Sequence, residues 1–171
     1  KMSWEYDDPS KDDDRWIYLP ALKKVRRISG SSKNDYFMGS DFTYDDMGGR
    51  SVDEDKHTLL KEETVEQRSC WVIRSVPVDK DEMYSSVTRW IDKESNIAVK
   101  AEYYNRNGSL LKVLHLRDLR LQNGFWTVFK YVMENRQSKH QTVLQMDTVE
   151  YDQGIKDSMF RVSTLERGRL K

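Results

Sequence analysis

The side chains that most often carry out chemistry are scattered along this sequence. The three histidines, His57, His115 and His140, lie far apart, and none has a cysteine or carboxylate at metal-ligand spacing on a shared face. The one cysteine, Cys70, begins the apolar run Cys70–Ile73, which predicts a buried and inert thiol. These residue types at these spacings predict no metal site and no cofactor.

Motifs for catalysis are also missing from the pattern. We find no phosphate-binding glycine loop, no nucleophile elbow and no Ser/His/Asp order. The acidic clusters 12–14 and 53–55 lack the spacing of a calcium loop, and we expect them to be solvated turns. No pair of carboxylates stands out for acid–base work. We therefore expect no catalytic residues and interpret the chain as a protein that is not an enzyme.

The balance of positive and negative residues argues against nucleic acid as a partner. Lysine plus arginine and aspartate plus glutamate both number 29 in 171 residues, so no bulk field attracts nucleic acid. The basic run 23–27 is expected on an edge strand, where its cations discourage strand addition. Nucleic acid is excluded as a partner. The length fits a single domain over 1–171. From the strand-like start at 1–6 we expect that the N-terminal part of a parent protein is missing.

A period of two dominates the hydrophobic pattern, as in antiparallel sheets. The candidate strands are 1–6, 14–20, 23–29, 57–66, 68–77, 85–92, 97–106, 109–121, 125–136 and 139–151. Residues 30–56 lose this period and should hold at most one helical turn, near 44–47. A second short helix is expected within 156–167. The fold class is mainly β: a strongly bent antiparallel meander with few short helices.

Turn chemistry fixes the register of the later strands. Asn107-Gly108 and Asn123-Gly124 are hairpin signals, because both central residues of a type I′ turn have positive φ. Further short loops are expected at Gln137-Ser138 and Glu94-Ser95. These loops predict the following pairs: Trp90 with Val99, Val99 with Leu116, Ala101 with Leu114, Leu116 with Tyr131, Leu114 with Met133, Tyr131 with Leu144, and Phe129 with Met146.

Cross-strand partners share a face, so the turns converge on one apolar stripe. Its residues are Trp90, Val99, Ala101, Leu114, Leu116, Phe129, Tyr131, Met133, Leu144 and Met146. The opposite face carries polar residues such as Lys100 and His115, except near Asn123, where Leu121 and Trp126 predict that the hairpin tip buries its other side. The stripe fits either an ordinary closed core or a groove left open for an apolar ligand. The pattern alone favours the core.

One stretch is more specific than these patterns. The sequence from Asp13 to Ile28, DDRWIYLPALKKVRRI, is followed by FMGSDFTYDDM at 37–47, and by HTLL at 57–60 and CWVI at 70–73. Together these segments resemble the bacterial outer-membrane lipoprotein-sorting protein family, the larger relatives of LolA and LolB. The likeness covers nearly the whole chain. The family's signal peptide, first helix and first strands have no counterpart before Lys1.

The resemblance implies an unclosed half β-barrel with an apolar cavity that accepts acyl chains. It favours the open groove, lined by the stripe, over the closed core. The expected function is a non-catalytic periplasmic carrier or binder of the acyl chains of lipid or lipoprotein, with a role in outer membrane biogenesis and transport. The alternative is a protein-interaction accessory module that docks to a membrane transporter through its edge strands. The purified protein's organic extract would discriminate between them.

Overall fold

The computed structural model describes residues 1–6, 13–28 and 30–167 and divides the chain into two compact units. The first unit comprises Lys1–Tyr36, Thr43–Gly49 and Glu150–Lys171, and the second comprises Phe37–Phe42 and Arg50–Val149. The prediction that the chain is a single domain stays a prediction.

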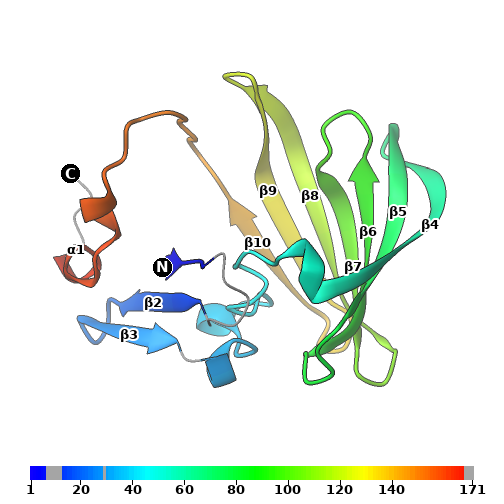
Figure 1. The fold of residues 1–171 in the computed structure, drawn as a ribbon. Helices are drawn as coiled ribbons and strands as arrows, with labels where there is room; N and C mark the ends of the chain where they lie inside the picture. The colour runs from blue at the N-terminus through cyan, green and yellow to red at the C-terminus, as the bar shows by residue number, and fades with distance from the viewer. Residues whose placement is uncertain (7–12, 29, 168–171) are drawn as a thin grey trace. The chain divides into compact units, whose positions relative to one another are not determined.

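The first unit contains a three-stranded antiparallel sheet with short helices (Figure 1). Its elements are β1 (Met2–Trp4), β2 (Asp14–Leu19), β3 (Lys24–Ile28), η1 (Gly30–Ser32), η4 (Asp157–Phe160) and α1 (Val162–Arg167). The indole of Trp4 donates a hydrogen bond to the carbonyl of Phe160 at 2.9 Å, which ties the C-terminal segment to β1. The buried guanidinium of Arg15 is paired with Asp13 and Asp45. These contacts join segments distant in sequence.

The second unit is a seven-stranded antiparallel meander in the order β10-β9-β8-β7-β6-β5-β4 (Figure 1). Its strands are β4 (Asp55–Val65), β5 (Arg68–Pro77), β6 (Tyr84–Asp92), β7 (Ala98–Asn105), β8 (Leu110–Gln122), β9 (Phe125–Asn135) and β10 (His140–Gln145). Two short 3₁₀ helices, η2 (Phe37–Gly39) and η3 (Val52–Glu54), belong to the same unit.

The seven-stranded sheet curves without closing. β4 and β10 are its two edges, and among the described residues they are not paired with each other. Two contacts reach across the curve near one end. Arg117 of β8 forms an ion pair with Glu66 at 3.2 Å, and the Arg68 guanidinium lies 5.6 Å from the ring centroid of Trp126 in β9. The chain is therefore mainly β and forms an unclosed half-barrel, as predicted.

The hairpin turns explain why most of the predicted register is correct. Asn123 and Gly124 have φ of 50° and 85°, the left-handed values of the expected two-residue turn. At the preceding hairpin only Gly108 has positive φ, and a bulge between Tyr103 and Tyr104 lengthens the loop. Beyond the bulge Ala101 still pairs with Leu114, so the predicted register is confirmed there.

Three predictions about the elements need correction. The chain forms two separate sheets instead of one meander. The last strand ends at Gln145 instead of continuing to 151, and residues 44–47 form turns, with the nearby 3₁₀ helices at 30–32, 37–39 and 52–54. Residue 29, the last of the predicted third strand, lies outside the described residues, and β3 is described as Lys24–Ile28. The short helix within 156–167 is confirmed.

Candidate functional site

The predicted apolar stripe forms three rows across β7–β10. The rows are Ala101–Leu114–Met133, Leu116–Tyr131–Leu144 and Phe129–Met146. In the third row the Met146 amide donates to the Phe129 carbonyl at 2.8 Å just beyond the end of β10. Because partners opposite each other share a face, these eight residues lie on one side of the sheet. The register predicted from turn chemistry is confirmed for these pairs.

Exposure changes along this apolar face. Ala101, Met133 and Phe129 are buried, while Leu116, Tyr131 and Leu144 are half-buried. Met146, at the border, is 41% exposed. The Arg120 guanidinium covers the ring of Phe129 at 4.5 Å from its centroid. The face therefore has a partly exposed apolar surface over β8–β10, next to the buried side chains of Ala101, Met133 and Phe129.

Trp90 and Val99 do not follow the predicted register. A bulge between Trp90 and Ile91 sets Trp90 opposite Lys100 and leaves Val99 without a direct partner in the β6–β7 ladder. The β7–β8 ladder begins at Lys100, so the predicted pair of Val99 with Leu116 is not part of it. Both residues are buried in a cluster with Cys70 and Val72, against which Leu119 packs. The sequence signal for this bulge was weak, because no glycine marks it.

The opposite face of the sheet carries a series of charged and polar contacts between β4, β6 and β7. The Lys100 ammonium lies 4.1 Å from the ring centroid of Trp90 and pairs with Glu102 at 2.7 Å. The Trp90 indole donates to Glu63 at 2.9 Å, and the hydroxyl of Tyr104 donates to Glu102 at 2.7 Å. We call the set Glu63, Trp90, Lys100, Glu102 and Tyr104 the polar ladder. The hydrogen bonds from Trp90 and Lys61 hold the pKa of Glu63 below its usual value.

One end of the apolar face is bounded by a row of polar partners. Tyr103 pairs with Lys112, Lys112 with Asn135, and Asn135 with His140. Lys112 is fully buried, its ammonium lies 5.1 and 5.6 Å from the ring centroids of Tyr84 and Tyr103, and it donates to the carbonyl of Asp41 at 3.1 Å. A buried ammonium requires such partners, since desolvation alone would be costly. The row therefore marks where the apolar surface stops.

Asp41 reaches this row from a segment about 100 residues earlier. Its buried carboxylate accepts hydrogen bonds from His140 Nδ1 and from the Thr142 hydroxyl, both at 2.7 Å. The Asp41 amide donates to the same Thr142 oxygen at 2.9 Å. The segment Phe37–Phe42 is thereby fastened to edge strand β10. Sequence reasoning missed this cluster, because Asp41 lies in the aperiodic region and no local spacing relates it to β10.

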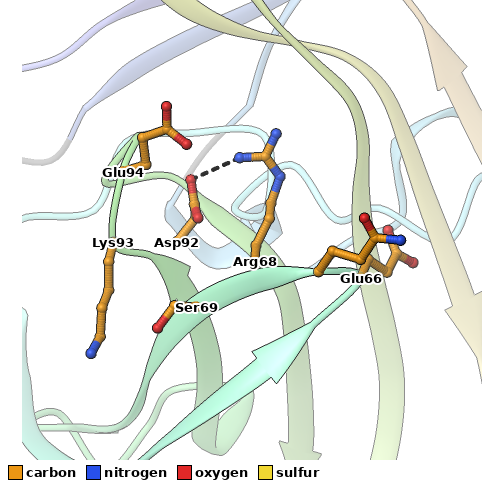
Figure 2. Close-up of a pocket in the computed structure, with 7 residues that line it drawn as sticks. Glu66, Arg68, Ser69, Asp92, Lys93 and Glu94 are labelled. Atoms are coloured by element: carbon orange, nitrogen blue, oxygen red, sulfur yellow. Dashed lines mark hydrogen bonds and ion pairs between the residues drawn. The ribbon is translucent and has the colours of Figure 1, made fainter.

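A separate hollow of about 420 Å³ lies at the turns after β4 and β6 (Figure 2). Its lining residues are Glu66, Gln67, Arg68, Ser69, Asp92, Lys93 and Glu94. Arg68 and Asp92 form an ion pair of 3.0 Å there, and although burial opposes it, hydrogen bonds from Ser95 hold the pKa of Asp92 below its usual value. None of the ten predicted groove residues lines this hollow. Its charged lining does not suit an acyl chain.

Of the two remaining histidines, His57 has ordinary polar partners and His115 is half-buried opposite Lys100. His57 is hydrogen-bonded to the Ser75 hydroxyl and to the Val52 carbonyl, both at 2.9 Å. Burial, with the nearby charge of Arg117, lowers the pKa of His115. Over the described ranges, no group of three or more His, Cys, Asp or Glu side chains is arranged to hold a metal ion. Nor does any helix in those ranges have the length and apolar character needed to cross a membrane.

Comparisons with known proteins identify relatives of this arrangement. A sequence family described only as "Uncharacterized protein" matches residues 2–167. No curated protein matches the chain. A domain described as that of an outer membrane lipoprotein-sorting protein from Vibrio parahaemolyticus is 32% identical, with a TM-score of 0.85 over 92% of this chain and 67% of that one. A DUF1329 family protein from Desulfovibrio piger is 35% identical, with a TM-score of 0.88 over 95% and 69%.

A LolA superfamily protein from Nitrosomonas europaea shares the fold, with a TM-score of 0.64, 21% identity, and coverage of 86% of this chain and 66% of that one. The chain spans about two thirds of the length of these solved structures. Its fold and relatives define a LolA-like half-barrel protein. The chain belongs to the family of the lipoprotein-sorting domain from Vibrio parahaemolyticus and is similar to the DUF1329 family protein from Desulfovibrio piger.

Proposed function

We propose that this chain is a non-catalytic periplasmic carrier that binds the acyl chains of lipid or lipoprotein on the apolar face of β7–β10. The observation that carries the proposal is the continuity of that face. Three rows of apolar side chains from four adjacent strands lie on one side of the sheet, and the row at its border ends in the exposed Met146. Apolar, methionine-containing surfaces of this kind suit flexible aliphatic ligands.

The chemistry at the ends of the face supports the same ligand class. The buried row around Lys112 closes one end with polar groups, while Phe129 and Met146 lie toward the other. An acyl chain needs a long apolar surface and forms few hydrogen bonds. The apolar rows over β8–β10 form such a surface. The family that the chain belongs to includes a domain described as lipoprotein-sorting, which agrees with a ligand of this kind.

The test is a titration with a fluorescent fatty acid. The change is Met146→Arg, with Val143→Arg as its matched control. Both residues are on or next to β10 and have similar exposure, 41% and 47%, but Val143 pairs with Val132 on the other face. Because Met146 is exposed, an arginine there can extend its charge to water, so the melting temperature should change little.

We expect Met146→Arg to weaken fatty-acid binding by about tenfold or more, because a charged side chain would then stand beside the bound acyl chain. A tenfold change in affinity corresponds to about 1.4 kcal/mol. Val143→Arg should leave binding unchanged, and so should Lys100→Glu in the polar ladder. Equal loss in both arginine variants, or no binding by the native protein, would contradict the proposal. A collapsed melting temperature for Met146→Arg would instead indicate an ordinary core.

A protein-interaction module is the second candidate, and one observation favours it. The 11-residue edge strand β4 has exposed side chains along most of its length, including Leu59 and Leu60. An edge of this length can add a strand from a partner, such as a membrane transporter. Organic extraction of the purified protein, followed by mass spectrometry, separates the candidates. Co-purified fatty acid or phospholipid supports the carrier, whereas a clean extract with tight transporter binding supports the module.

A further inference from the structure

The segment Phe37–Phe42, which we call the end segment, lies on one end of the apolar face of β7–β10. Thr142 pairs with Met133 and therefore shares its face. The Thr142 hydroxyl donates to the Asp41 carboxylate at 2.7 Å and accepts from the Asp41 amide at 2.9 Å. The end segment and strands β4–β10 belong to the same compact unit. These contacts place the end segment over the row of the apolar face that contains Met133.

Burial along the face follows the position of the end segment. Met133 and Ala101, in the row that Thr142 continues, are 0% and 2% exposed. Tyr131, two residues along β9, is half-buried. Beyond it the ring of Phe129 is covered by the Arg120 guanidinium. The covered row at Met133 therefore continues the partly exposed apolar surface that forms the proposed groove.

Asp41 fastens the end segment to two further strands of the face. Lys112 Nζ of β8 donates to the Asp41 carbonyl at 3.1 Å, and His140 Nδ1 of β10 donates to the carboxylate at 2.7 Å. Lys112 and His140 both lie opposite Asn135, in the row next to Met133. The amide, the carbonyl and the carboxylate of Asp41 are thus all hydrogen-bonded to the sheet. Asp41 is consequently the residue that positions the end segment.

The end segment is a tight turn closed by its own hydrogen bonds. The Ser40 amide donates to the Phe37 carbonyl at 2.8 Å, and the Phe37 amide donates to the Phe42 carbonyl at 2.7 Å. Met38 and Gly39 have φ of 49° and 74°, the positive values that a type I′ turn requires at both central residues. Phe42 is 3% exposed. A closed turn with a buried aromatic residue favours one fixed shape, as an end wall requires.

We propose that the end segment is the end wall of the acyl groove and, positioned by Asp41, sets the length of acyl chain that the half-barrel binds. This inference rests on the proposed function. Side chains on one face of a strand recur about every 7 Å, so uncovering the Met133 row would lengthen the groove by about that distance, which accommodates several methylene groups. Each methylene group that leaves water strengthens binding by roughly fourfold. Affinity should therefore stop increasing at one chain length while the wall is in place.

The experiment is a titration with saturated fatty acids from octanoic to eicosanoic acid, which gives the chain length at which affinity stops increasing. Asp41→Ala removes the carboxylate, and Thr142→Val removes the hydroxyl while it keeps the shape of the side chain. In both variants the limiting length should increase by about two methylene groups or more, and acids beyond the native limit should bind about tenfold or more tightly than they bind the native chain. Thr58→Val, at an exposed threonine of edge strand β4, is the control and should keep the native limit.

Hydrogen exchange of the Asp41 amide reports the release of the end segment. This amide should exchange faster in both variants, while amides in β8 stay protected. Because Thr142→Val is the more conservative change, it keeps the comparison valid if Asp41→Ala lowers the melting temperature. Unchanged exchange at Asp41, the same limiting length in the native chain and both variants, or affinity that keeps increasing with length in the native chain would overturn the inference alone. No binding of any fatty acid by the native chain would overturn the carrier proposal with it.

Discussion

The two faces of the seven-stranded sheet are stabilised by different interactions. One face is apolar, with Ala101 and Met133 buried and no charge between them in their row. The other carries the polar ladder, in which Lys100 bridges the Trp90 ring and the Glu102 carboxylate. The apolar face depends on the removal of side chains from water, and the ladder depends on pairing at partly exposed sites. At Met133 and Glu134 a shift of one residue therefore moves a substitution from a buried apolar side chain to an ion-paired one.

The largest expected effect is a charge placed at the centre of the apolar face. Met133→Asp should destabilise the fold by about 3–5 kcal/mol, because it removes a buried side chain and buries an unpaired carboxylate. Met133 is fully buried. Urea unfolding followed by circular dichroism measures the change.

The neighbouring residue supplies the control for this comparison. Glu134, which pairs with Arg136 at 2.8 Å, lies on the other face of β9. Glu134→Gln should cost less than about 1 kcal/mol, as is usual for exposed ion pairs. Similar losses at 133 and 134 would show that the two faces do not differ as described.

A smaller effect is expected on the stability of the fold at low pH. Although burial opposes it, hydrogen bonds from Lys100 and Tyr104 hold the pKa of Glu102 below its usual value. A carboxyl whose pKa is lowered by folding contributes stability above its unfolded pKa, near 4.3, and that contribution is lost as pH falls through the lower folded value. The native chain should therefore lose stability as pH falls below about 4.3.

Removal of the ladder's cation sharpens this prediction. Lys100→Met should lower stability at neutral pH by less than about 1 kcal/mol. Below about pH 4.3, the urea midpoint of the variant should depend less on pH than that of the native chain. The expected result is two curves of unfolding midpoint against pH that converge in acid. Parallel curves would mean that Lys100 does not set the pKa of Glu102.

Turn chemistry made much of the half-barrel predictable. The Asn123-Gly124 turn adopts the expected left-handed conformation, and it aligns Leu116 with Tyr131 as predicted. Local rules succeed here because a hairpin's register depends mainly on its own loop. Trp90 was misplaced because a bulge depends on how the strands fit together in three dimensions, and no residue type marks it.

The candidate site was predictable only where it is periodic. Leu114 and Leu144 could be assigned to one face because alternation needs no knowledge of distant contacts. The Asp41 cluster could not, since it joins an aperiodic segment to Thr142, 101 residues later. Exposure at the hairpin tip was misjudged for a related reason: Leu121 is apolar and alternates correctly, but nothing in the described part of the chain covers it sufficiently to bury it.

Photo-crosslinking with a diazirine-labelled fatty acid, mapped residue by residue by mass spectrometry, tests the central claim most directly. Because the two faces alternate along the same strands, the positions of the adducts report the face that holds the acyl chain. If the acyl chain lies on the apolar face, adducts should form on Leu116, Tyr131, Leu144 and Met146. Adducts concentrated instead on Lys100, Glu102 and His115, or no specific adducts at saturating fatty acid, would contradict it.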